Sequence, residues 1–156
     1  MTQVKRGLRA VLLEGPFAQT LAAVNAEHAD GLVVPALRTV KRAELKQLAE
    51  TPAIELVGVR TTPTSSDGFE CEHVVAVRVF VAGDDEEYIT DVVERYLTAI
   101  DRVFNSAPGD EARLWPWLPG VVSTGEQDYD PVMQGKDLEP TLVKVGAIEV
   151  LVRASR

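Results

Sequence analysis

The chain has few of the residues from which cross-links and metal sites are built. Its 156 residues include one cysteine, Cys71, and two histidines, His28 and His73. A single cysteine excludes an intrachain disulfide and fits a reducing compartment. Cys71 and His73 share one face of a predicted strand, but a zinc site needs about four ligands. A Cys–His nucleophile pair would also need an orienting group. We interpret both residues as structural.

Long apolar runs and an overall basic character are missing as well. No window approaches the roughly 20 apolar residues of a membrane span, and the N-terminus lacks the apolar core of a signal peptide. The formal net charge is −8, which argues against nucleic-acid binding by the whole surface. We expect a protein that stays in water and has no membrane partner.

What is present is ordinary for one globular domain. Hydrophobic residues make up 46% of the chain and charged residues 26%. A chain of this length buries about 70% of the surface that it exposes when unfolded, so it can form a core without cross-links. We predict a single domain over residues 1–156.

The charges are unevenly spread along the chain. Acidic residues gather at 84–87 and 126–130. Seven basic residues lie in the first third: Lys5, Arg6, Arg9, Arg38, Lys41, Arg42 and Lys46. This asymmetry fits complementary contacts between copies or with partners, and it also fits ordinary solvated faces. Both interpretations remain open.

The N-terminal third predicts helices and an extended crossing. Residues 5–14 and 16–28 have helical periodicity, and Gly15 and Pro16 separate them into either a kinked helix or two helices. Gly31 is a stop signal. Residues 32–40 are expected to be extended, whereas 41–50 suit a short helix or a loop.

Alternating apolar residues predict four strands around one long helix. The strands are expected at 53–60, 71–82, 121–128 and 142–153, with a hairpin loop at 61–68 and the helix at 86–105. Residues 107–120 and 129–140 are expected to be connections. The acidic cluster 84–87 is explained by the positive end of the helix dipole, which it stabilises by about 0.3–1 kcal/mol per charge, so no metal is needed there.

This order predicts an α+β fold, a mainly antiparallel sheet of about four strands with the long helix and the N-terminal helices packed on it. Both faces of the two best strands, 71–82 and 142–153, are rich in apolar residues. The face away from the long helix therefore needs a cover. Either a neighbouring copy or the N-terminal helices of the same chain would provide it.

Two further patterns are partly similar to known binding motifs, but each lacks residues that the motif needs. Glu126, Asp128 and Asp130 are carboxylates in a turn, but the EF-hand spacing is absent. Gly120 and Gly125 have P-loop spacing, yet Glu126 and Gln127 follow where that motif needs Lys and Ser or Thr, so the glycines are interpreted as strand boundaries.

Trp115 and Trp117 are interpreted as packing anchors. We predict no catalytic, cofactor-binding or metal-binding residue, no cofactor, and no enzymatic activity.

Several stretches, in order, resemble the tail terminator (tail completion) proteins of long-tailed bacteriophages. They cover about two-thirds of the chain: residues 21–31 (LAAVNAEHADG), 71–80 (CEHVVAVRVF), 86–104 (EEYITDVVERYLTAIDRVF), 121–129 (VVSTGEQDY) and 142–153 (LVKVGAIEVLVR). The resemblance rests on pattern and order, since the family is not defined by catalytic residues. Residues 32–52 match least well.

The resemblance implies a structural protein of the virion, assembled in the host cytoplasm. Such proteins form a homohexameric ring at the head-proximal end of the tail tube, where they stop tube growth and join the head connector. The implied partners are other copies of the chain, the tail tube protein and a connector or neck protein, and genomic DNA passes through the ring without specific binding. Residues 61–68 would suit a loop that orders on assembly. The alternatives are another neck protein, such as a connector or stopper, or a small cytoplasmic ligand-binding or enzyme domain with a ferredoxin-like sheet.

Overall fold

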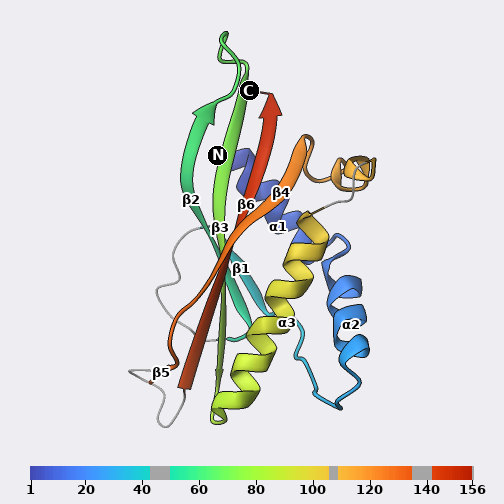
Figure 1. Cartoon of the computed structure of the whole chain (residues 1–156), viewed down its shortest axis with the longest axis vertical. Helices are drawn as coiled ribbons and strands as arrows, with labels where there is room; N and C mark the ends of the chain where they lie inside the picture. Colours follow the sequence, from blue (N-terminus) through green and yellow to red (C-terminus); the bar gives the residue numbers. More distant parts are fainter. Residues whose placement is uncertain (43–49, 106–108, 135–141, 156) are drawn as a thin grey trace.

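A computed structural model describes residues 1–42, 50–105, 109–134 and 142–155. Within these residues the chain is α+β, with one twisted sheet and a layer of helices packed on it (Figure 1). This confirms the predicted fold class. No helix in the described part of the chain is long and apolar enough to cross a membrane.

The sheet is built around two long antiparallel strands, β3 and β6, which pair along their whole length. β2 pairs with the other side of β3, and β4 with the other side of β6, both antiparallel. The order across the sheet is β1-β2-β3-β6-β4, and the short β5 pairs with one end of β6. The strands are β1 Thr39–Lys41, β2 Ala53–Pro63, β3 Glu70–Gly83, β4 Val121–Tyr129, β5 Met133–Gln134 and β6 Leu142–Ser155.

The four predicted strands are β2, β3, β4 and β6, whereas β1 and β5 were not expected. β1 is parallel to β2 and pairs only at Ala53 to Glu55. Residues 61–68 were predicted to be a loop, but β2 continues to Pro63. Threonines favour strands, and Thr61 and Thr62 pair with His73 and Glu72. The tight turn is therefore confined to 64–69.

Helix α3 (Glu86–Phe104) lies across β3 and β6. It begins where Asp85 caps it, because the Asp85 carboxylate accepts the backbone N–H of Tyr88 at 3.2 Å, and Glu86 and Glu87 follow in the first turn. It ends where Arg113 donates to the exposed carbonyls of Arg102 and Val103, at 3.0 and 2.6 Å. Both ends of the helix are thus fixed by polar groups.

The chain passes from β3 through α3 to β4, with β6 lying between these two strands. β3 and β4 each run antiparallel to β6, so they are parallel to one another. This is a split β-α-β unit, of the kind found in ferredoxin-like sheets. It explains how a mainly antiparallel sheet contains a long crossover helix.

The N-terminal region forms two separate helices, α1 (Thr2–Leu13) and α2 (Phe17–His28). They break at Gly15, where a Cβ would lie 2.7 Å from the Val11 carbonyl oxygen. α2 ends before Gly31, with Ala29 in the left-handed conformation. α1 packs against β1 and β2, and α2 packs against α3.

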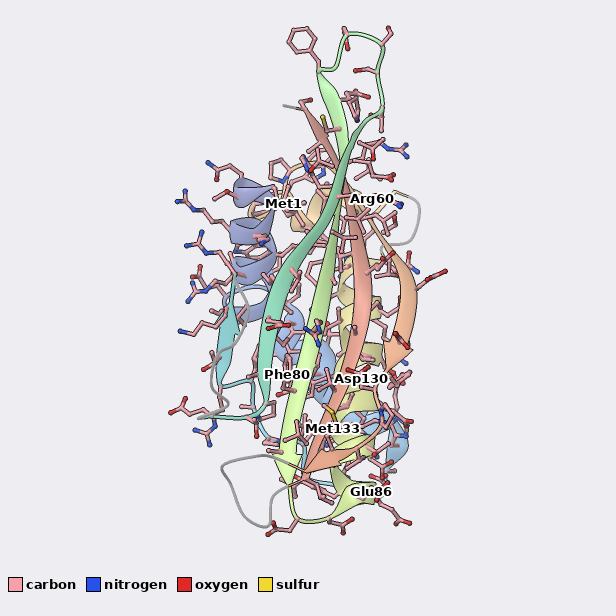
Figure 2. The ribbon with its side chains drawn as sticks, turned by 90° about the vertical axis from the view of Figure 1, so that its left-hand side faces the viewer. Met1, Arg60, Phe80, Glu86, Asp130 and Met133 are labelled. Carbon is pink, nitrogen blue, oxygen red and sulfur yellow. The ribbon has the colours of Figure 1, made fainter. Side chains whose placement is uncertain are left out.

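All three helices lie on the same side of the sheet, as Figures 1 and 2 show. The second face of the sheet is therefore not covered by the N-terminal helices. That alternative is excluded, and the neighbouring copy remains a prediction.

The core lies between this helical layer and one face of the sheet. Gly146 on β6 allows the closest approach, because a Cβ there would lie 2.6 Å from Val93 and 2.8 Å from Leu97 of α3. The fully buried members of the core include Leu8, Phe17, Ile54, Leu56, Ile89, Tyr96, Leu97, Ile100, Phe104 and Ile148.

The predicted extended crossing is held against α3 by tyrosine hydroxyls. Tyr96 donates to the Pro35 carbonyl at 2.6 Å and Tyr88 to the Val33 carbonyl at 2.9 Å. Burial raises the pKa of Tyr96, so this phenol stays protonated and remains a donor. The crossing is thus fixed to the helical layer. Residues 43–49, within the stretch predicted as a helix or a loop, lie outside the described residues.

Candidate functional site

Cys71 and His73 lie together on the helix-covered face of β3, and both are buried. The Nδ1 atom of His73 lies 2.9 Å from the Thr61 hydroxyl on β2. In the described part of the chain, no group of three His, Cys, Asp or Glu side chains is arranged to hold a metal ion. The geometry thus gives His73 a structural hydrogen bond between strands, and Cys71 a buried position beside it.

The two acidic clusters also have local explanations. Asp85 caps α3, as described above. Asp128 accepts the backbone N–H of Tyr129 at 2.9 Å, and the Asp130 carbonyl accepts from Lys144 at 2.7 Å. Asp128 and Tyr129 lie in β4, so Asp128 belongs to a strand and not to the predicted turn.

The P-loop-like glycines serve the sheet. Gly120 has a φ of 131° just before β4, and a Cβ there would lie 2.5 Å from the Arg153 carbonyl oxygen. Gly125 was also interpreted as a strand boundary, but this is wrong: it lies inside β4, where the register shifts between Thr124 and Gln127. A bulge needs an extra residue with conformational freedom, which glycine provides.

The two tryptophans differ. Trp117 packs against the core, and its backbone carbonyl lies so close to Gly7 of α1 that a Cβ there would be 2.6 Å away. Trp115 is 55% exposed and donates through Nε1 to the Gly120 carbonyl at 3.2 Å. The packing role predicted for both fits Trp117 alone.

The helix-free face of the sheet, which faces the viewer in Figure 2, carries a charged pair between β2 and β3. Glu55 of β2 is paired in register with Arg78 of β3, and the two side chains form a salt bridge in which the Glu55 side chain is 2% exposed. The Arg78 guanidinium also lies 5.4 Å from the centre of the Phe80 ring. Around them lie small or half-buried residues such as Ala76 and Ala147. The Glu55–Arg78 pair and these small side chains leave little apolar surface exposed around them. This face therefore needs a covering subunit less than the apolar sequence suggested.

Two arginines of α3 are matched to carboxylates at or just after the end of α2. Arg95, buried in α3, binds Asn25 and Asp30 at the end of α2. Further along α3, Arg102 forms a two-pronged pair with Glu27 at 2.6 and 2.7 Å. These contacts join α2 to α3, and the arginine hydrogen bonds hold the pKa values of Asp30 and Glu27 below their ordinary range.

The cations at one edge of the sheet have no such partners among the described residues. We call Lys5, Arg9, Lys41 and Arg42 the basic edge; they lie on α1 and at β1, beside the outer side of β2. Lys5 donates to the Arg42 carbonyl at 3.1 Å and Arg9 to the Val40 carbonyl at 3.2 Å. Among the described residues, none of the four forms an ion pair with a carboxylate. Side chains ending in nitrogen project on this side in Figure 2.

Two adjoining grooves run along the basic edge. One, of about 460 Å³, is lined by Met1, Lys5, Arg42 and residues 56–61 of β2. The other, of about 660 Å³, shares Met1, Lys5 and Arg42 and continues past Arg9 and Lys41. β1 pairs with β2 only as far as Glu55. In the described part of the chain, β2 from Leu56 to Pro63 therefore has no strand on its outer side.

The opposite edge of the sheet is acidic. β4 is the last strand in the order, and Figure 1 shows it on the far side from β2. We call Glu126 and Asp128 of β4, with Glu94 of α3, the acidic edge. All three are exposed, and none forms an ion pair among the described residues. Burial and the negative charge of Glu94 raise the pKa of Tyr129 at the end of β4.

Sequence reasoning identified the individual charges but not the edges that they form. The basic cluster and the acidic run 126–130 were both visible, whereas their places at opposite ends of one sheet depend on the strand order. The Glu55–Arg78 pair was missed. Its signal is a single charged residue in the middle of each of two apolar strand segments.

Comparison with known proteins does not assign the chain to a group. No protein-family model matches it, and no curated protein matches it at a significant level.

Proposed function

We propose that the chain is a structural protein of a long-tailed bacteriophage virion, which forms a homohexameric ring at the head-proximal end of the tail tube. In this role it ends tube growth and joins the tail to the head connector. The observation that carries the proposal is a sheet open at two edges of opposite charge, on a chain whose order of elements resembles tail terminator proteins.

The two open edges support assembly from identical copies. A surface that is complementary to a different surface of the same molecule makes a head-to-tail contact, and such contacts close into rings when the rotation fits. The basic edge and the acidic edge are surfaces of this kind, because they lie at opposite ends of the strand order.

The helical layer supports a rigid building block. Its paired arginines and its capped α3 fix the helices to one face of the sheet, while the other face and both edges remain accessible. A structural role needs such a block and no turnover of a substrate.

A reconstitution experiment tests the role. Tail tube protein is polymerised with and without the purified chain, and the tubes are imaged by electron microscopy. We expect tubes that stop growing and carry a ring at one end. Tubes that grow to the same length and carry no bound chain would refute the proposal.

The same experiment separates the terminator from a connector or stopper. A terminator blocks the addition of further tube subunits at the end that it occupies. A connector or stopper binds the head portal or an already finished tail and leaves tube elongation unchanged.

A further inference from the structure

We propose that successive copies in this ring meet through opposite edges of the sheet, with the acidic edge of one copy docked against the basic edge of the next. The proposal rests on the ring proposed above and specifies its interface. Its occupant is a second copy of this chain.

The charges on the two edges are of opposite sign, which favours contact between them. The carboxylates of Glu126 and Asp128 and the cations of Lys5 and Arg42 are accessible and have no ion-pair partner in the described part of the chain. By contrast, Arg95 and Arg102 of the helical layer are paired with carboxylates of the same chain. Complementary charge steers association and fixes the register of an interface.

Apolar surface lies beside the charged groups on both edges. The groove of the basic edge has Leu56, Val57 and Val59 along one wall, and Val59 is 52% exposed. On the acidic edge, Val121 and Tyr129 at the two ends of β4 are 57% and 42% exposed. Both edges therefore combine charge with apolar contact area, as protein interfaces do.

The directions of the two edge strands also suit this contact. β2 and β4 run in opposite directions, because β2 is antiparallel to β3, β3 to β6 and β6 to β4. In a ring whose axis follows the strands, β4 of one copy would meet β2 of the next copy in antiparallel orientation. The contact would thus continue the pattern already present inside the subunit.

The test uses two charge-reversed variants of the full chain. Lys5→Glu with Lys41→Glu and Arg42→Glu makes both edges acidic, because Arg9 is then the one cation left of the four, and Glu126→Lys with Asp128→Lys makes both edges basic. Each variant alone places like charges across every contact. We expect each to need a protein concentration higher by about a hundredfold or more for assembly, since like charges facing each other oppose binding strongly.

Mixing the two variants gives the decisive result. The edge beside β2, made negative in one variant, then faces the β4 edge made positive in the other. The two unchanged edges also carry opposite charges. The mixture is expected to assemble as an alternating ring with three copies of each variant, seen by native mass spectrometry. The double variant Glu14→Lys with Glu87→Lys makes the same change in net charge as Glu126→Lys with Asp128→Lys, but away from both edges, and it should assemble like the wild type.

The outcomes separate this interface from the ring itself. If the wild type forms rings and both variants form them equally well, edge docking is wrong and the proposed function survives. If both variants are monomers and the mixture also stays monomeric, edge docking is likewise overturned. If the wild type remains monomeric at every concentration and in the presence of tail tubes, the ring and the edge contact fail together.

Discussion

The helical layer and the basic edge differ in the groups that their cations bind. Arg102 of α3 binds Glu27 of α2, and Arg95 of α3 binds Asp30 just after α2. Among the described residues, the side chains of Lys5 and Arg9 of α1 bind backbone carbonyls instead. The first pair stabilises the subunit. The second pair leaves positive charge available to another molecule. If copies assemble as proposed, stability and assembly depend on separate regions, and each can be changed without the other.

The largest loss of stability is expected in the core beneath α3. Leu97 is completely buried and contacts the position of Gly146. Leu97→Ala removes this packing and should lower the free energy of unfolding by about 2–5 kcal/mol, measured by denaturant titration. Leu13→Ala is the control: Leu13 is 42% exposed, so its loss should be much smaller. Equal losses would show that the covered layer is not the source of stability.

A smaller loss is expected from filling the close contact between α3 and β6. In Gly146→Ala the new methyl group would overlap Val93 and Leu97, and overpacking typically costs about 1–3 kcal/mol. A reduced unfolding midpoint in thermal melting is the expected result. An unchanged midpoint would mean that the helix shifts freely over the sheet.

Acid should weaken the junction between α2 and α3 before the rest of the fold. The pKa values of Asp30 and Glu27 lie below their ordinary values of 3.8 and 4.5 in the folded chain, because arginines donate to both. Groups with lowered pKa stabilise the fold above those ordinary values, and the stabilisation is lost as the pH falls through the lower folded values.

Unfolding followed between pH 7 and pH 2 checks this. The wild type should lose stability below about pH 4.5, and Asp30→Asn should be less stable at pH 7 and lose less on acidification. Parallel pH curves for the two proteins would contradict the assignment of the acid response to Asp30.

The smallest effect on stability is expected at the basic edge. Lys5→Glu with Lys41→Glu and Arg42→Glu changes one half-buried and two exposed cations, none of which has a carboxylate partner among the described residues, and surface substitutions usually stay within about 0.5 kcal/mol each. Thermal melting should therefore match that of the wild type while assembly is lost. A large fall in stability would show that these cations serve the subunit and would remove the contrast with Arg95 and Arg102.

Long periodic segments were the part of the fold that could be predicted from the sequence. α3, β3 and β6 each carry a continuous apolar pattern, and the acidic start of α3 indicated its cap. β1 and β5 were not visible, because three and two residues are too short for a period and depend on pairing with distant strands. The extension of β2 to Pro63 was missed because Thr and Pro were interpreted as a turn.

The candidate site was predictable only in part for the same reason. Lys5, Arg42, Glu126 and Asp128 could be recognised as unevenly distributed charges. That they lie near opposite edges follows from the strand order, in which β6 is inserted between β3 and β4. Local sequence patterns do not contain this information.

The most direct test of the account is the mass of the purified wild-type chain at low and at high salt. Edge contacts built on Lys5, Arg42, Glu126 and Asp128 are screened by salt, because the screening length falls from about 10 Å at 0.1 M to about 3 Å at 1 M. The account predicts six times the single-chain mass in about 0.1 M salt and a shift toward the single-chain mass in about 1 M salt. A single-chain mass at both salt concentrations, with and without tail tubes, would contradict it.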